Sequence, residues 1–181
     1  MKIYAASLSD YNAGLLHGAW FDLADYNDSE ELYDAIKKQV LETSPTAKAE
    51  GLPAAEEFAI HDYDDAHPEG LGEYESLDYL MDIQDCLNKC IDRGIDEEAF
   101  CAWWTEISGV HSSADFDSFE DVYCGKYDSK EDFAYDLIEQ SGMLDDVPET
   151  LSKYFDYEAY ARDLFLDGYT MTEDGYVFAD Y

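Results

Sequence analysis

The imbalance of charge constrains the fold of this chain more than any other feature of its sequence. The 181 residues include 44 Asp and Glu against 10 Lys and Arg, which gives a formal net charge of −34 at pH 7. A surplus of this size is typical of disordered chains, which lack the apolar residues needed for a core. Here, however, 46% of the residues are hydrophobic and 15% are aromatic. The sequence therefore predicts a folded protein with a strongly anionic surface.

The same charge excludes several classes of function. An anionic surface repels the phosphates of nucleic acids and the head groups of anionic lipids, so we expect neither direct nucleic-acid binding nor membrane binding. No apolar run approaches the roughly 20 residues that span a bilayer. The segment Met1–Ala6 lacks the charged and apolar parts of a secretory leader. We therefore expect a cytoplasmic protein whose cysteines are reduced.

Candidate metal ligands are few. Cys86 and Cys90 are four residues apart on a predicted helix, but no second Cys or His pair stands at zinc-ligand spacing, which favours buried thiols. The segment His61–Asp65 resembles the start of a calcium loop, yet the sixth-position Gly and the closing Glu are missing. Loose association of a divalent cation stays possible there. We expect no dedicated metal site and no cofactor.

Apolar periodicity and turn signals predict an α+β protein of three small units. These are a strand-rich N-terminal unit at residues 1–72, a helical unit at 73–110 and an α+β unit at 111–181. The elements expected in the first unit are a hairpin of strands at 2–8 and 15–23, a helix capped by Asp28, a surface loop at 42–56 and a strand at 57–63. The apolar side of that helix is predicted to comprise Leu32, Tyr33, Ile36 and Val40.

The middle unit contains two predicted helices, at 75–92 and 96–107. On a helical wheel the first helix carries an acidic stripe, interrupted only by Lys89. The stripe consists of Glu75, Asp78, Asp82, Asp85 and Asp92. The opposite, apolar side consists of Leu77, Leu80, Met81, Leu87 and Ile91.

The third unit contains a helix with the same arrangement of an acidic side and an apolar side. The elements expected are a short helix or turn after His111–Ser113, a strand at 122–127, a helix from the capping box Ser129–Asp132 to Gly142, a short helix with Pro148 at its first position, a helix at 156–163, and a closing hairpin of 164–172 and 176–179. Asp132, Asp136 and Glu139 lie on one side of the helix that ends at Gly142.

The acidic stripes have two interpretations. A row of carboxylates is ordinarily a solvated helix face. Unit charges about 5 Å apart, however, repel by about 0.8 kcal/mol even in water, and solubility needs a net charge of only about 2 to 8. Because duplex DNA carries one charge per about 1.7 Å, 34 charges correspond to about 17 base pairs. The carboxylates are therefore candidate phosphate surrogates for a protein that grips DNA, and tyrosines between them either pack in the core or provide flat contact area.

The candidate phosphate surrogates lie in four stretches of the chain. They are Asp62, Asp64, Asp65, Glu73, Glu75, Asp78, Asp82, Asp85, Asp92, Asp132, Asp136 and Glu139. Carboxylates this numerous carry little catalytic information, because acid and base catalysis needs two carboxylates in different environments. We therefore predict a protein that is not an enzyme.

Several sequence blocks resemble the ArdA-type antirestriction proteins of conjugative plasmids and transposons. In chain order, the blocks are Ile3–Leu8, Tyr11–Gly14, Gly18–Phe21, Glu57–Tyr63 and Tyr154–Leu164. The resemblance implies an elongated, curved homodimer that mimics DNA, binds the methyltransferase core of type I restriction-modification enzymes, and inhibits restriction and, less strongly, modification. The 42–56 segment is longer than the family pattern leads us to expect.

The last block looks like the antirestriction motif of the family. Its candidate residues are Tyr154, Asp156, Tyr157, Glu158, Tyr160, Arg162 and Asp163, which either contact the target or hold the third unit together. For Arg162, a role in a structural ion pair is favoured over a contact with the target. The resemblance also implies a dimer contact in the third unit, which we assign on physical grounds to Phe119, Val122, Tyr123 and Cys124 as an exposed strand edge.

Two alternatives to DNA mimicry remain open. An acidic interaction module for a basic nucleoid-type protein would bind many basic proteins with little preference. An enzyme with paired carboxylates would lose all activity on a single Asp→Asn change. Mimicry instead predicts small losses spread over many acidic residues.

Overall fold

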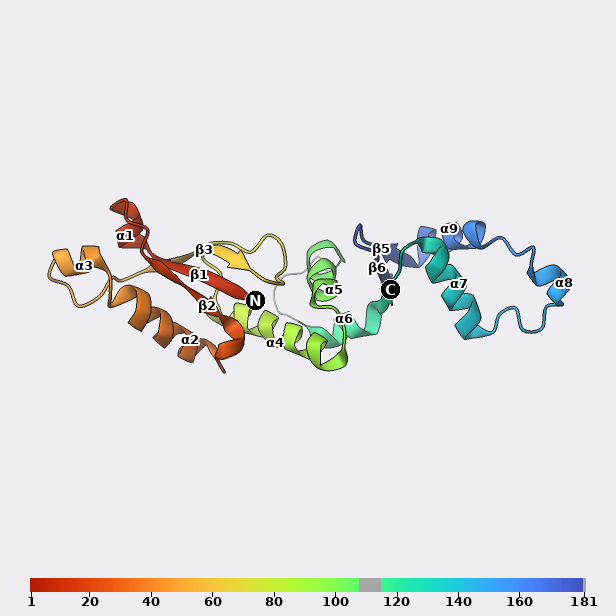
Figure 1. The fold of residues 1–181 in the computed structure, drawn as a ribbon, viewed down its shortest axis with the longest axis horizontal. Coiled ribbons are helices and arrows are strands. Elements are labelled where there is room, and N and C mark those ends of the chain that lie inside the picture. Colours follow the sequence, from red (N-terminus) through yellow and green to blue (C-terminus); the bar gives the residue numbers. More distant parts are fainter. Residues whose placement is uncertain (108–114, 181) are drawn as a thin grey trace. The chain divides into compact units, whose positions relative to one another are not determined.

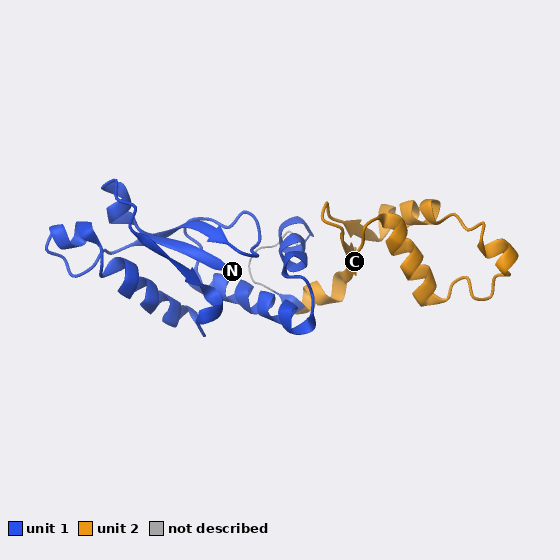
Figure 2. Cartoon of the chain, viewed as in Figure 1, with its two compact units in different colours: residues 1–116 blue, residues 117–181 orange. Residues whose placement is uncertain are grey.

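The computed structural model describes residues 1–107 and 115–180, and its mixture of helices and strands confirms the α+β class (Figure 1). Two compact units comprise residues 1–116 and 117–181 (Figure 2). The predicted boundary after residue 72 lies within the first of them. The predicted short helix or turn after His111–Ser113 lies outside the described residues, and the three-unit division stays a prediction.

Unit 1 is organised around an antiparallel sheet in the order β2-β1-β3. Its strands are β1 (Lys2–Ser7), β2 (Gly18–Asp22) and β3 (Phe58–Asp64). The predicted hairpin of the first two strands is confirmed by their antiparallel pairing, but the strand bounds at 8 and 15–17 are wrong. Residues 8–12 form helix α1 (Leu8–Asn12) instead, because the Ser7 hydroxyl accepts a hydrogen bond from the Asp10 N–H and caps a helical turn.

Helix α2 (Ser29–Ile36) begins after its predicted cap, where Asp28 accepts a hydrogen bond from the N–H of Glu31. It continues as a π-turn, η2 (Lys37–Leu41), which packs against β1 and β2. A short 3-10 turn, η1 (Leu23–Asp25), precedes it. Leu32, Ile36 and Val40 are buried as predicted, whereas Tyr33 is 43% exposed because it lies at the margin of the apolar stripe, beside Phe58.

The segment 42–56 is not simply a surface loop, and this prediction is corrected. It contains helix α3 (Pro45–Ala49), which is capped by Ser44. Leu41, Ala47 and Ala55 form a small buried cluster that packs against Phe58. The apolar residues are too widely spaced along the sequence to give a periodic signal, so only the fold of the segment brings them together.

Asp10 fixes this segment to α1. Its carboxylate is fully buried, and its Oδ1 accepts a hydrogen bond from the Thr46 N–H at 2.8 Å. Burial alone raises the pKa of a carboxyl group, but interactions with Ser44, Thr46 and Ser7 outweigh it and hold the pKa of Asp10 well below its ordinary value. Asp10 therefore stays ionised inside the protein.

Replacing Asp10 with Asn lowers stability in a way that depends on pH. Because the pKa in the folded state is below that of the unfolded chain, about 3.9, the contribution is complete above that value and is lost as pH falls below it. We expect a loss of about 1 to 3 kcal/mol at pH 7 that shrinks toward pH 3. Urea unfolding of both proteins at pH 7, 5 and 3 measures the difference, with exposed Asp34→Asn as the control. A difference that is the same at all three pH values would contradict the assignment.

Unit 1 ends in helices α4 (Leu77–Arg93) and α5 (Glu97–Ala102), followed by a π-turn, η3 (Trp103–Ile107). Gly94, at φ 67°, provides the left-handed residue that ends α4. Leu80, Leu87 and Phe100 are fully buried, but Ile91 is 57% exposed and does not belong to the apolar side predicted for it. Its position near the end of the helix leaves it beside solvent.

Unit 2 consists of a second antiparallel sheet, in the order β4-β6-β5, with three helices after β4. The elements are α6 (Phe116–Val122), which spans the boundary between the units, β4 (Tyr123–Lys126), α7 (Lys130–Ser141), α8 (Glu149–Ser152), α9 (Tyr157–Asp167), β5 (Tyr169–Met171) and β6 (Tyr176–Ala179). Phe133 of α7 contacts Phe165 of α9 and Tyr169 of β5.

The predicted ends of the helices and the predicted hairpin in unit 2 are largely confirmed. Ser129 caps α7, left-handed Gly142 ends it, and β5 pairs with β6 as the closing hairpin. Two details are wrong. Residues 164–167 continue α9 rather than forming a strand, and Pro148 is the N-cap of α8 rather than its first helical residue. Among the helices of residues 1–107 and 115–180, none combines the length and apolarity needed to cross a membrane.

Candidate interaction surface

The longest row of candidate carboxylates lies on α4. Asp78, Asp82, Asp85 and Asp92 are exposed, while Leu80 and Leu87 on the other side of the helix are buried. Asp78, Asp82 and Asp85 are three or four residues apart, which places their Cβ atoms about 5 to 6 Å from one another, close to the spacing of phosphates along a nucleic-acid strand. Asp92 lies seven residues beyond Asp85, with the exposed Lys89 between them. Asp78 also accepts a hydrogen bond from the Ser29 hydroxyl, which links the row to the start of α2.

Glu75 does not belong to this helical row. It precedes the first residue of α4, is half-buried, and accepts a hydrogen bond from the Gly72 N–H at 3.0 Å. The helix begins only after Ser76, whose hydroxyl caps it through the N–H of Tyr79. The predicted helix therefore began two residues too early, because the acidic pattern continues past the Ser76 cap although the helix does not.

The acidic residues of β3 and the loop after it are exposed. Asp62 and Asp64 lie on the strand, and Asp65 follows it with φ 60°. Asp65 is 2.8 Å from the Lys2 amino group, and this hydrogen bond lowers the pKa of Asp65 and raises that of Lys2. Glu73 is exposed as well. Because Lys2 partly compensates its charge, Asp65 is a poorer phosphate surrogate than its neighbours.

The acidic residues of α7 differ in their surroundings. Asp132 and Glu139 are exposed, but Asp136 is half-buried. Asp136 accepts hydrogen bonds from the Tyr127 hydroxyl at 3.0 Å and from the Gln140 side chain at 2.6 Å. Burial and this carboxylate together raise the pKa of Tyr127 to about 12. Asp136 therefore has a structural role that the sequence pattern did not reveal.

The motif residues occupy the start of α9 and the turn before it. Asp156 caps the helix by accepting a hydrogen bond from the Ala159 N–H at 2.9 Å. Tyr157 is half-buried and packs on Phe155 and on Tyr135 of α7. Tyr160 also packs on Phe155, whereas Tyr154 and Glu158 are exposed. Part of the motif thus holds α9 in place, and part of it faces solvent.

Arg162 and Asp163 form an exposed ion pair in this motif. The guanidinium Nη2 is 3.3 Å from the Asp163 carboxylate, and both side chains are more than two-thirds exposed. A pair in such a setting contributes at most about 1 kcal/mol. Both groups are consequently accessible to a partner.

The residues assigned to a dimer contact separate into two environments. Phe119 is fully buried inside unit 2, where it stacks on Tyr123 and contacts Phe178. Val122, Tyr123 and Cys124 are half-buried, and the last two belong to β4, which is an outer strand of its sheet. The expected strand edge is wrong for Phe119 and Val122, which belong to α6, and Phe119 is buried as well. The dimer contact itself stays a prediction.

The cysteines are free thiols. Burial raises the pKa of Cys86 to about 11 and that of Cys90 to about 12, and it also raises the pKa of Cys101. Such thiols are poor nucleophiles and poor metal ligands. In the described part of the chain, no three His, Cys, Asp or Glu side chains form a group able to hold a metal ion.

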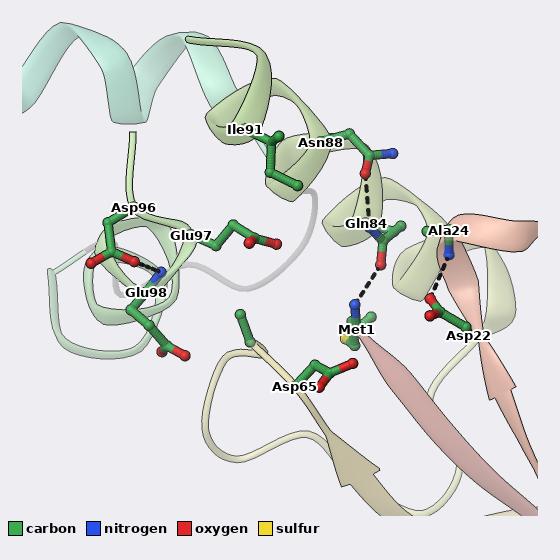
Figure 3. A pocket seen from close by; sticks show the side chains of 11 residues that line it. Met1, Asp22, Ala24, Asp65, Gln84, Asn88, Ile91, Asp96, Glu97 and Glu98 are labelled. Atoms are coloured by element: carbon green, nitrogen blue, oxygen red, sulfur yellow. Dashed lines mark hydrogen bonds between the residues drawn. The ribbon is translucent and has the colours of Figure 1, made fainter. Parts of the chain in front are cut away.

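A cavity of about 450 Å³ lies in unit 1 beside the start of β1 (Figure 3). Gln84 lines it, accepting a hydrogen bond from the Met1 amino group and donating one to Asn88, both at 2.9 Å. Carboxylates line much of the rest, including Asp22, Asp96 and Glu98. Among the described residues that line the cavity, none is a His, Cys, Ser or Thr.

The N-terminal sheet carries an aromatic pair that no sequence pattern had singled out. Tyr4 and Trp20 are directly opposite each other on β1 and β2, with ring centroids 5.4 Å apart. Strand alternation could have placed both on one face, but nothing in the sequence distinguished a covered face from an open one.

Comparison with family models gives a match over residues 3–178 to the family described as Antirestriction protein (ArdA). No curated protein matches the chain. The matched range includes every candidate carboxylate and the whole of the candidate motif.

Proposed function

The chain belongs to the ArdA antirestriction family, and on this premise we propose that it mimics DNA and occupies the DNA-binding groove of type I restriction-modification enzymes. The observation that carries the proposal is the exposed row Asp78, Asp82, Asp85 and Asp92 on the solvent side of α4. If every Lys and Arg paired with one acidic residue, the chain would still carry 34 uncompensated negative charges.

The physical basis of inhibition is competition for the same cations. Enzymes that grip DNA line their groove with Lys and Arg, and much of the binding free energy comes from release of the counterions around the phosphates. A folded protein with carboxylates at similar spacing releases counterions in the same way and provides no bases to read or cut. The mechanism needs neither a catalytic residue nor a cofactor.

The partner in this proposal is the methyltransferase core, because that part of the enzyme holds the recognised duplex. A homodimer would carry twice the charge of one chain, which corresponds to the phosphate charge of about 34 base pairs. Restriction is inhibited and modification is inhibited less strongly. These activities protect incoming DNA of a mobile element in the cytoplasm of a new host.

Competition with DNA tests the proposal directly. We expect the protein to displace a labelled duplex from a purified type I methyltransferase at one dimer per enzyme. Displacement should weaken steeply as salt rises from about 50 to 200 mM, as DNA binding itself does over that range. Fluorescence anisotropy of the duplex measures the displacement.

Other results would assign a different target. If the protein inhibits restriction in cells but displaces no duplex, it acts on the motor subunit or on assembly. If it inhibits nothing and binds many basic proteins with similar affinity, it is an acidic interaction module.

A further inference from the structure

We propose that the open face of the N-terminal sheet, bearing Tyr4 and Trp20, is a contact surface for arginine side chains of the target enzyme. The inference rests on the proposed function and deepens it, since it adds an aromatic contact to the matching of charge. We call these two residues, with Asp22, Asp62 and Asp64, the aromatic face.

The strand register places these residues together on one side of the sheet. Tyr4 is opposite Trp20 on β2 and opposite Asp62 on β3, and Lys2 is likewise opposite Asp22 and Asp64. The alternate residues Ile3, Ala5 and Phe21 point to the other side and are buried. On that covered side η2 packs against β1 and β2, and α2 also contacts β2 (Figure 1). The aromatic face is therefore the side that the helices leave open.

Gly18 leaves room for the Tyr4 ring on this face. A Cβ at this position would come within 2.9 Å of the Tyr4 ring and 2.5 Å of the Ala5 carbonyl oxygen. The Tyr4 ring covers Gly18 on the outer strand β2 and fills the space of the missing side chain. This packing alone explains a tyrosine at position 4. It gives no reason for Trp20, which is 47% exposed.

The charge around the rings selects the partner. Asp62 lies opposite Tyr4, and Asp22 and Asp64 lie opposite Lys2 at the next position of the same side. Among the described residues of this face, Lys2 is the one cation, and it is paired with Asp65. An anionic partner is repelled there, whereas a cationic one is attracted. A cation over an indole or phenol ring is attracted by the negative face of the ring, and a neighbouring carboxylate strengthens the attraction.

Arginine fits this arrangement better than lysine does. Its planar guanidinium stacks on an aromatic ring while its N–H groups reach a carboxylate at the edge, whereas an ammonium group is a compact and strongly hydrated charge. Trp, Tyr and Arg are also the residues that carry most of the free energy at protein interfaces. The groove of an enzyme that binds DNA supplies such arginines.

Peptides of ten arginines or ten lysines test the preference without the enzyme. We expect the wild-type protein to bind the arginine peptide about two- to five-fold more tightly than the lysine peptide. Trp20→Phe keeps an aromatic face and should retain part of the preference, while Trp20→Leu should abolish it. Tyr33→Leu, at an exposed tyrosine on α2, is the matched control and should change nothing. If Trp20→Leu keeps the full preference, the inference is wrong.

The same variants are then compared in the DNA competition assay. Trp20→Leu should weaken displacement about five-fold with an unchanged salt slope, because stacking involves no counterion release. Asp62→Asn should reduce the salt slope by about one. Displacement equal to that of wild type with Trp20→Leu would overturn the contact. Failure of the wild-type protein to displace DNA would instead overturn the proposed function, whatever the peptides show.

Light scattering tests whether the effect of Trp20→Leu comes from a change of oligomeric state. The molar mass in solution should be the same for wild type and Trp20→Leu. A change of mass would show that the aromatic face joins two copies of this chain, and would overturn its assignment to the enzyme.

Discussion

Reversing three charges on α4 is expected to weaken displacement of DNA from a type I methyltransferase by about 100-fold at 50 mM salt. The variant carries Asp78→Lys, Asp82→Lys and Asp85→Lys, and all three side chains are exposed. Each reversal removes an attraction and adds a repulsion, each of about 0.5 kcal/mol at an exposed site, so that three reversals amount to about 3 kcal/mol. The loss should shrink as salt is raised, because exposed charges are screened.

The reversal leaves the fold intact for a physical reason. None of the three carboxylates belongs to the buried side of α4, and the three lysines repel one another about as much as the three carboxylates do, so the helix keeps its packing and nearly the same repulsion along the row. Asp78 alone loses a defined contact, the hydrogen bond from Ser29. The circular dichroism spectrum and the melting temperature of the variant should therefore remain close to those of wild type.

A matched control separates position from net charge. The variant Glu30→Lys, Asp34→Lys, Glu42→Lys changes the net charge by the same amount at three other exposed positions of unit 1, none of them a candidate surrogate. We expect it to lose much less than the α4 variant does. Equal losses would mean that only net charge matters, and unchanged inhibition by the α4 variant would remove this row from the interface.

Truncating Phe178 to Ala is expected to unfold unit 2 while unit 1 stays folded. Phe178 is fully buried on the central strand β6, where it contacts Phe119 and Tyr123. Removing a ring from such a site costs about 3 to 5 kcal/mol. A unit as small as residues 117–181 has a total stability of about that size, so the loss consumes most of it.

The distribution of tryptophan allows each unit to be followed separately. All three Trp residues, Trp20, Trp103 and Trp104, belong to unit 1. In a urea titration of Phe178→Ala, tryptophan fluorescence should give the wild-type midpoint, while far-ultraviolet circular dichroism should be reduced before urea is added. Tyr154→Ala, at an exposed ring of the same unit, serves as the control and should stay within about 0.5 kcal/mol of wild type. A common shift of both signals would mean that the two units unfold as one.

Local signals in the sequence were sufficient to predict where most helices begin and end. The caps at Asp28 and Ser129 and the stops at Gly94 and Gly142 each depend on a side chain or a backbone angle within four residues. The closing hairpin of β5 and β6 was equally local. The sequence misled us where an interaction from elsewhere in the chain decided the outcome. Segment 42–56 is the clearest example, because its structure depends on the buried carboxylate of Asp10.

Sequence alone determined that this protein is α+β and strongly anionic, and that the carboxylates of α4 lie opposite its apolar side, because these properties follow from composition and helical periodicity. Family membership followed from the order of its sequence blocks and is confirmed over residues 3–178. Tertiary structure alone decided which carboxylates are exposed. Asp78, Asp82 and Asp85 lie exposed in one row, whereas Asp10 and Asp136 are held by hydrogen bonds inside their units. It also decided which side of the sheet stays open, since that depends on where the helices pack, which no periodicity within a strand encodes.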